Sequence, residues 1–371
     1  MMLDLRIKTS RLMGLDQDLV LHGGGNTSLK ERDTIYVKAS GFNLDTIDER
    51  GFAPVSTHKL LDLLEFESLS DTDMVRLQRE AMRDQSFANP SIEAVLHALI
   101  PFKYVDHTHA DAIVTISNSK NGKKILSKLY GKNFIIVPYV MPGFVLAKTV
   151  HNLTCKANWT KLKGIILMHH GVFTFDDNGM KSYQKMLGVV KVAEDYLKKH
   201  TKIVYKKAKA THDLDKIKAL VSKIKGYEVE MVLNDSKIAQ TFASQKDLSL
   251  SQKGVLTPEH IIRTKRAPVV LSKDYEQEIN KYIKKYIQYF EKHRVSEMML
   301  SPAPNWAVLK DFGTLSFGKT LKEAEIIRDI NEHTMKAMLR ARQLGGYKSL
   351  NAKDSFAMEY WELEQAKLRK A

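Results

Sequence analysis

Two segments of the chain contain histidines whose spacing could form a metal site. The first is Val105–His109 and the second is Met168–Gly171. Side chains two apart on a β-strand point to the same face, so His107 and His109 project together if the first segment is a strand. His170 could add a third ligand from the end of a later strand. Three protein ligands and one open position are typical of a catalytic zinc, but ordinary polar residues at strand ends explain the spacing equally simply.

A carboxylate lies shortly before the first histidine pair. We expect Ser91 to cap a helix that holds Glu93 in its first turn, where the helix dipole favours a carboxylate. Glu93 and His97 are four residues apart and share one face of that helix. The helix leads directly into the strand of His107 and His109, which could bring Glu93 close to a metal. Simple helix-start chemistry is the alternative explanation of this carboxylate.

A glycine-rich segment precedes these motifs. Gly23–Gly25 is followed by Asn26, Thr27 and Ser28, and a loop of this composition can cradle a phosphate or another anion. The segment matches neither the dinucleotide fingerprint nor the P-loop, because the later glycines and the Gly-Lys-Ser/Thr ending are missing. A hairpin turn is the competing interpretation. A second turn of small residues follows at Ala39–Gly41.

The elements that must position these residues alternate between strands and helices, which predicts an α/β fold. We expect strands at 35–38, 104–109, 134–138, 164–168 and 172–175, and helices at 3–20, 60–69, 73–84, 110–131 (two helices), 143–153 and 179–201. The basic stretch 198–212 marks an expected domain boundary. Beyond it, helices at 213–225, 273–293 and 320–344 and a strand at 306–309 predict a smaller α/β unit.

Composition sets limits on the class of protein. The 371 residues carry a formal charge of +15, with lysines in nearly every segment and no nucleic-acid-binding motif. We therefore expect a lysine-rich surface that attracts small anions and no nucleic-acid partner. The single cysteine, Cys155, excludes an intrachain disulfide and fits a reducing compartment. The sequence has no apolar leader and no run of about 18 apolar residues, so we expect a cytoplasmic protein without a membrane partner.

Taken in order, five motifs resemble the class II aldolase/adducin family. They are Gly25–Ser28, Ala39–Gly41, Pro90–Glu93, His107–His109 and His170–Gly171, and together they cover about the first 205 residues. The chain is more closely similar to the rhamnulose-1-phosphate aldolase-like half of bifunctional aldolase/short-chain dehydrogenase proteins. Two later segments, Thr257–Lys265 and Glu359–Glu364, carry that closer resemblance. The sequence lacks the motif Gly-x-Gly-x-x-Gly, so we do not expect dehydrogenase activity.

The resemblance implies a fold, a metal and a set of site residues. The fold would be a three-layer α/β/α sandwich at residues 1–205, followed by a smaller C-terminal α/β domain at residues 206–371. The metal would be Zn²⁺ or another divalent cation, and the assembly a homo-oligomer, commonly a tetramer. The implied residues are the metal ligands His107, His109 and His170, the acid/base group Glu93, and the substrate or phosphate contacts Gly25, Asn26, Ser40, Gly41 and Ser91.

The reaction implied by the family is aldol cleavage of a ketose phosphate, similar to rhamnulose 1-phosphate, through a zinc-stabilised enediolate. Relatives also carry out epimerisation, decarboxylation or dehydration of anionic sugar-like substrates with the same metal site. A non-catalytic adducin-like scaffold is a third possibility, although that interpretation predicts lost ligands. Two residues depart from the family pattern: Ile92 replaces a second serine, which removes one phosphate donor, and His169 replaces an asparagine.

The C-terminal region contains a second polar group of residues. Thr257 and Pro258 are typical of a helix start, and His260, Arg263 and Lys265 follow at close spacing. These side chains could contact the anionic end of a substrate. An exposed helix start is the other explanation.

Overall fold

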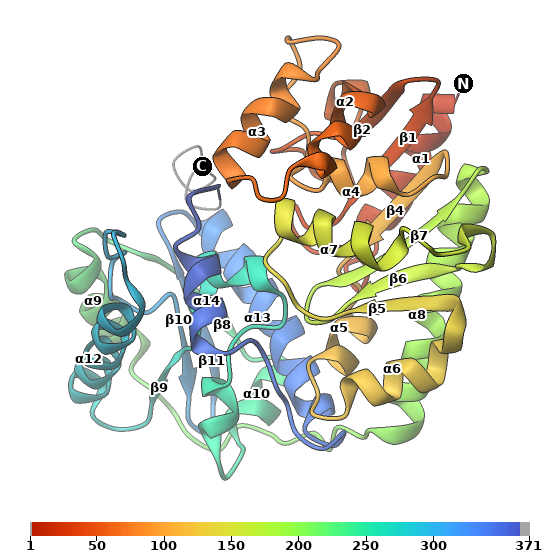
Figure 1. The fold of residues 1–371 in the computed structure, drawn as a ribbon. Coiled ribbons are helices and arrows are strands. Elements are labelled where there is room, and N and C mark those ends of the chain that lie inside the picture. Colours follow the sequence, from red (N-terminus) through yellow and green to blue (C-terminus); the bar gives the residue numbers. More distant parts are fainter. Residues whose placement is uncertain (1, 364–371) are drawn as a thin grey trace. The chain divides into compact units, whose positions relative to one another are not determined.

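The computed structural model describes residues 2–363 and divides the chain into two compact units (Figure 1). Unit 1 comprises Met1–Ser117 and Asn121–Lys199, and unit 2 comprises Asn118–Lys120 and His200–Ala371. Met1 and the last residue of the motif Glu359–Glu364 lie outside the described residues.

Unit 1 is built on one seven-stranded sheet with the order β3-β2-β1-β4-β7-β6-β5. Its strands are β1 (Asn26–Glu31), β2 (Thr34–Lys38), β3 (Phe52–Ser56), β4 (Tyr104–Thr108), β5 (Phe134–Val137), β6 (Gly164–Leu167) and β7 (Gly171–Asp176). Its helices are α1 (Met2–Gly14), α2 (Thr57–Asp62), α3 (Asp71–Glu80), α4 (Ala94–Leu99), α5 (Asp111–Ser117), α6 (Gly122–Tyr130), α7 (Phe144–Thr154) and α8 (Gly179–His200). All neighbouring strands pair antiparallel except β5 and β6.

Alternation along the strands gives this sheet two covered faces. Val105 and Phe173 belong to one buried core that also contains residues of α2, α4 and α7. The next residue of β4, Asp106, instead forms a buried ion pair with Arg6 of α1 (2.6 Å), and Thr108 contacts Met186 of α8. Helices therefore cover both faces, which is the three-layer arrangement expected from the family.

Several boundaries differ from the predicted ones for local reasons. Helix α1 ends at Gly14 rather than at residue 20, and Gly14 packs closely on another segment, since an added Cβ would lie 2.1 Å from the backbone nitrogen of Asp45. Strand β1 begins at Asn26, so Asn26, Thr27 and Ser28 lie on a strand and not in the predicted loop. Strand β3 was not predicted, because Pro54 interrupts its apolar pattern.

Unit 2 is a smaller α/β unit with a four-stranded sheet in the order β8-β11-β10-β9. The strands are β8 (Glu230–Asn234), β9 (Val269–Leu271), β10 (Trp306–Leu309) and β11 (Gly313–Gly318). The helices are α9 (Leu214–Lys225), α10 (Lys237–Ala243), α11 (Ile261–Thr264), α12 (Tyr275–His293), α13 (Leu321–Ala341) and α14 (Ala352–Glu359). Residues from α9, α12 and the strands form its core, which includes Ile217, Ile279 and Phe317. The predicted mixed α/β class is thus confirmed.

Within residues 2–363, we find no helix whose length and apolar character would let it cross a lipid bilayer.

Candidate metal centre

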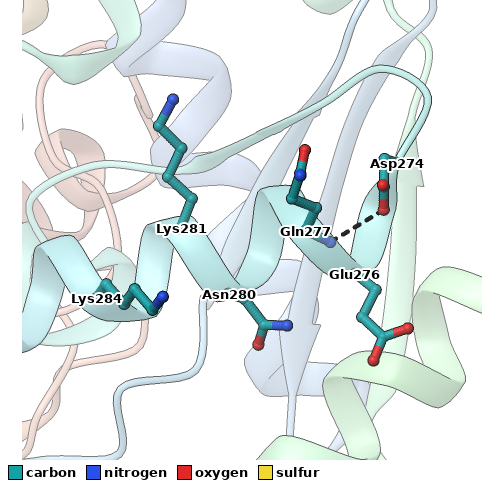
Figure 2. A pocket seen from close by; sticks show the side chains of 6 residues that line it. All are labelled: Asp274, Glu276, Gln277, Asn280, Lys281 and Lys284. Carbon is teal, nitrogen blue, oxygen red and sulfur yellow. Dashed lines mark hydrogen bonds between the residues drawn. The ribbon is translucent and has the colours of Figure 1, made fainter.

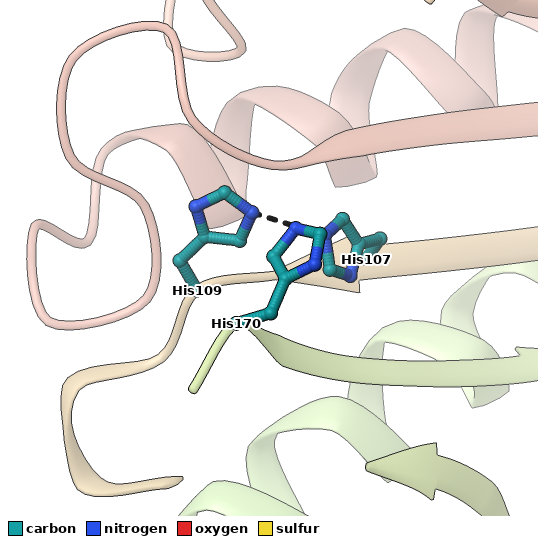
Figure 3. A group of neighbouring side chains, drawn as sticks. All are labelled: His107, His109 and His170. Atoms are coloured by element: carbon teal, nitrogen blue, oxygen red, sulfur yellow. Dashed lines mark hydrogen bonds between the residues drawn. The ribbon is translucent and has the colours of Figure 1, made fainter. Parts of the chain in front are cut away.

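Three histidines converge at one end of the central strand pair of unit 1 (Figure 3). His107 is in β4, His109 directly follows that strand, and His170 lies in the turn that joins β6 to β7. Their ligand nitrogens all lie within 4.8 Å of one another, and the Nε2 atoms of His107 and His109 are 3.0 Å apart. The structure therefore brings together the three residues that the sequence indicated as metal ligands.

The pairing of β4 with β7 explains why residues far apart in the chain meet. In this antiparallel pair, Thr108 lies opposite Val172, which places the turn before β7 beside the end of β4. Gly171 makes the close approach possible, because a Cβ at this position would lie 2.3 Å from the backbone oxygen of Thr108. A side chain at residue 171 would push His170 away from the other two histidines.

The ring of His107 is held in an orientation that suits a metal ligand. Its Nδ1 atom is 3.2 Å from the carbonyl oxygen of Val172, and the ring stacks on Phe173 with 4.1 Å between centroids. A carbonyl can only accept, so Nδ1 carries the proton and the Nε2 lone pair of the neutral ring points towards the cluster. A ligand histidine bound to a backbone carbonyl through its other nitrogen is the usual arrangement in metal sites. The donor set thus fits a divalent cation.

Glu93 lies against this cluster and is 5% exposed. Its Oε2 atom is 3.4 Å from Nε2 of His107, and its Oε1 atom is 3.7 Å from Nε2 of His170. Among the described residues, Oε1 has no hydrogen-bond partner. Glu93 is the N-cap of α4, and its side chain makes no capping bond, which corrects the prediction that it sits within the first turn. The carboxylate therefore faces the histidines instead of the helix end.

Asn26 and Ser91 hold the other side of this carboxylate. The Asn26 amide nitrogen donates to Oε2 of Glu93 (2.7 Å) and to Oγ of Ser91 (3.1 Å). The register of β1 on β4 places Asn26 opposite His107, so a residue predicted to lie in a loop is fixed by the sheet. Of the predicted substrate contacts, Asn26 thus bonds directly to the carboxylate of the predicted acid/base group, and Ser91 bonds to Asn26.

The glycine segment packs against the histidine strand. Gly25 has a φ of +64°, and a Cβ there would lie 2.8 Å from the carbonyl oxygen of His107. The hairpin between β1 and β2 turns at Arg32 and Asp33, so the glycines do not form that turn. The close approach and the positive φ are the properties for which the sequence indicated glycine here.

Ser40 and Gly41 lie at the exposed end of β2. The Ser40 backbone nitrogen donates to the carbonyl of Asn89 (2.8 Å), and the Ser91 nitrogen donates to that of Lys38 (2.9 Å). The backbone thus joins the segment of Ser40 to the segment that contains Ser91 and Glu93.

A buried histidine near the site was not identified as functional from the sequence. His97 of α4 is fully buried, with Nδ1 at 2.8 Å from Oγ of Ser28 and Nε2 hydrogen-bonded to Oδ1 of Asn26. Burial lowers the pKa of His97 well below its ordinary value. The four-residue spacing of Glu93 and His97 was the available signal, but spacing does not show that Asn26 lies between them.

Unit 2 contains an open hollow of about 490 Å³ near the start of α12 (Figure 2). Its lining residues are polar and extend from the helix start to the middle of the helix: Asp274, Glu276, Gln277, Asn280, Lys281 and Lys284. Asp274 caps the helix by accepting from the backbone nitrogen of Gln277 (3.1 Å), as the dashed line shows. None of the predicted site residues lines this hollow.

The polar residues predicted as an exposed helix start in unit 2 are mostly buried. Thr257 is 1% exposed, His260 is 8% exposed and Lys265 is 5% exposed. The Lys265 ammonium lies 3.5 Å from the ring centroid of Tyr286, which donates a hydrogen bond to Glu359 (2.7 Å). The two sequence motifs of the C-terminal region therefore meet in one buried cluster.

Comparison with known proteins agrees with this architecture. The profile of the class II aldolase and adducin N-terminal domain matches residues 5–197. The chain belongs to the class II aldolase/adducin family. The profile of the class II aldolase second domain matches residues 208–368, so family resemblance extends through unit 2.

A relative from Bacillus subtilis (strain 168), named uncharacterized oxidoreductase YuxG, is 29% identical over 395 residues. The match covers 97% of this chain but 57% of that protein. The relationship to the aldolase-like half of longer proteins, expected from the sequence, is thus confirmed.

Several solved structures are similar to about half of this chain. The N-terminal class II aldolase domain of a conserved Thermoplasma acidophilum protein is 40% identical, with a TM-score of 0.48, and the match covers 52% of this chain and 92% of that one. A sugar-phosphate aldolase from Thermotoga maritima is 16% identical, with a TM-score of 0.40 and coverage of 52% and 93%. L-fuculose-1-phosphate aldolase from Thermus thermophilus is 14% identical, with a TM-score of 0.37 and coverage of 53% and 92%.

Proposed function

We propose that this chain is a metal-dependent aldolase that cleaves a ketose phosphate, similar to rhamnulose 1-phosphate, into two carbonyl compounds. The observation that carries the proposal is the position of the Glu93 carboxylate, which lies within 3.4 Å of His107 and 3.7 Å of His170. An adducin-like scaffold has no need for three convergent histidines and a buried carboxylate beside them. Membership of the class II aldolase/adducin family supports the same conclusion.

We propose that His107, His109 and His170 hold the cation as neutral imidazoles. A divalent cation held there, zinc in the first instance, would act as a Lewis acid for the negative charge that carbon–carbon cleavage places on the substrate. Since neutral ligands leave the full charge of the cation in place, this set of residues suits that task better than carboxylates would.

Glu93 is the proposed acid/base residue. Its Oε1 atom has no hydrogen-bond partner among the described residues, so this oxygen can accept a proton from a substrate hydroxyl or deliver one to carbon. Its Oε2 atom is held by Asn26, which fixes the position of the carboxylate. Proton transfer by a positioned carboxylate accounts for about 10²–10⁴ in rate.

The substrate's anionic group is proposed to lie near Gly25, Asn26, Ser40, Gly41 and Ser91. Ile92 packs against the apolar core and offers no hydroxyl. That observation favours a second candidate, in which the same site acts on an anionic sugar-like compound without a phosphate, as an epimerase, decarboxylase or dehydratase.

A cytoplasmic homo-oligomer, tetrameric as in many relatives, is the proposed state, and light scattering of the purified protein tests the assembly.

The test combines metal analysis with a substrate screen. We expect about one zinc or other divalent ion per chain and aldehyde release from a ketose 1-phosphate, lost after chelation and restored by added Zn²⁺. Aldehyde release that survives complete metal removal would overturn the mechanism. Metal-dependent formation of an epimer, of CO₂ or of a dehydrated product, without aldehyde, would select the second candidate.

A further inference from the structure

We propose that His97 is a positioning residue that sets the orientation of the Asn26 amide and, through it, the position of the Glu93 carboxylate. The inference rests on the proposed role of Glu93 and concerns a residue that does not touch the metal site itself. A continuous series of hydrogen bonds runs from Ser28 through His97 and Asn26 to Glu93.

The direction of every hydrogen bond in this series follows from the carboxylate. An ionised carboxylate can only accept, so Glu93 requires the NH₂ group of Asn26. The amide oxygen of Asn26 must then point the other way, towards Nε2 of His97. An oxygen that accepts there requires a proton on Nε2. The neutral His97 ring therefore accepts at Nδ1, and the Ser28 hydroxyl donates to it.

The reverse orientation of the amide is unfavourable at both ends. A flipped Asn26 would present its oxygen to the Glu93 carboxylate, so two acceptors would face each other within about 3 Å. The flipped NH₂ would also meet the N–H of His97. Because Asn26 is 6% exposed and His97 is fully buried, water has little room to relieve either conflict.

Burial keeps His97 in the required neutral form. Desolvation lowers its pKa well below the ordinary value, although the nearby Glu93 charge acts in the opposite direction. The remaining contacts of the ring include the edge of Phe173, with 5.4 Å between centroids. A purely structural role would therefore require only an apolar side chain of similar length at residue 97.

Two variants of matched length separate positioning from packing. His97→Gln keeps an amide N–H for Asn26 and an acceptor for Ser28, whereas His97→Met fills similar volume without either. For the zinc-loaded full chain, we expect H97M to lower kcat for aldol cleavage by about 10- to 100-fold with little change in KM. We expect H97Q to retain kcat within about fivefold of wild type, because it restores the hydrogen bonds. Both variants should bind zinc as wild type does.

A second readout does not depend on catalysis. In protein labelled with ¹⁵N at asparagine and histidine, the wild-type His97 ring should show the Nε2–H tautomer, and the Asn26 NH₂ group should exchange slowly with solvent. H97Q should preserve the slow exchange of Asn26, and H97M should abolish it. If no substrate is cleaved by wild type, the proposed aldolase function fails, while this measurement still decides the positioning role.

Three results would overturn the proposal. Equal kcat values in H97Q and H97M, whether both low or both unchanged, would show that hydrogen bonding at residue 97 does not matter. Loss of zinc from H97M but not from H97Q would show that the substitution lowers kcat by disturbing the metal ligands and not by moving Glu93. An Nδ1–H tautomer of His97 in wild type would contradict the assigned direction of the bonds.

Discussion

The histidine cluster of unit 1 and the cluster of Lys265, Tyr286 and Glu359 in unit 2 (the lysine cluster) are both largely buried and polar, but their side chains are arranged differently. In unit 1, the ligand nitrogens of three histidines and a carboxylate oxygen converge at the ends of strands. In unit 2, the Lys265 ammonium donates to the carbonyl of Ser301 and lies over the Tyr286 ring, while Tyr286 donates to Glu359. The first cluster leaves ligand atoms facing a common point, whereas in the second the Lys265 ammonium and the Tyr286 hydroxyl each donate to an oxygen.

Burial acts on both ionisable groups of the unit 2 cluster. Desolvation lowers the pKa of Lys265 to about 7 and raises that of Glu359, so burial disfavours both charged forms. Such a cluster is costly to break from one side, because the remaining group is left buried without its partner. A buried ionisable group thus indicates a catalytic site only when its bonding atoms face a ligand position.

The largest expected difference between the two clusters comes from removing the Glu93 carboxylate of unit 1. We expect Glu93→Gln to lower kcat of aldol cleavage by about 10²–10⁴, because the amide cannot take a proton, while metal content stays at the wild-type level. Steady-state kinetics and elemental analysis measure the two quantities. The exposed Glu80→Gln variant is the matched control and should retain wild-type kcat. Full activity of E93Q would remove Glu93 from the mechanism.

Metal removal should affect one unit and not the other. Zinc at about a thousandfold above its dissociation constant stabilises the native state by about 4 kcal/mol, and chelation removes that contribution. Hydrogen exchange should therefore slow on zinc addition in 104–109 and 164–176, but not in 257–265 or 352–359. His107→Ala should abolish this response, and the corresponding His260→Ala change in unit 2 should not. Slower exchange in the unit 2 segments would end the distinction between the clusters.

The lysine cluster is expected to contribute to stability and not to catalysis. Lys265→Met removes the donor to Ser301 and the cation near Glu359, at a cost of about 3 kcal/mol in the free energy of unfolding. Urea unfolding measures the loss, and the exposed Lys284→Met variant should stay within about 0.5 kcal/mol of wild type. A folded K265M protein with kcat reduced tenfold or more would instead assign the unit 2 cluster to the active site.

The smallest expected effect is the contribution of His97, the buried histidine of unit 1, to the pH dependence of the free energy of unfolding. Because burial lowers the pKa of His97, the native ring stays neutral at a pH where the unfolded chain takes up a proton. The free energy of unfolding should therefore fall below about pH 6.5, by up to about 1.4 kcal/mol per pH unit. Denaturant titrations of wild type and H97Q should show this part of the slope in wild type alone. Parallel pH profiles would mean that His97 is protonated in the native state.

The sequence predicted the class of the fold and most of unit 1. Long periodic segments such as α8 and α12 follow their predicted ranges closely, because many turns of one apolar face specify a helix. Strands β3 and β9 were among those not predicted. Their local patterns are weak, and they are stabilised by pairing with another strand, β2 for β3 and β10 for β9.

Residue types and order by themselves determined the family and the candidate residues His107, His109, His170 and Glu93, because ligand chemistry depends on side-chain identity. Only the tertiary structure decided how these residues are held. Asn26 and His97 lie 71 positions apart, and no periodicity relates a residue on β1 to one on α4. The burial of Lys265 was equally inaccessible from the sequence, because burial depends on which segments pack together and not on the charge of the residue.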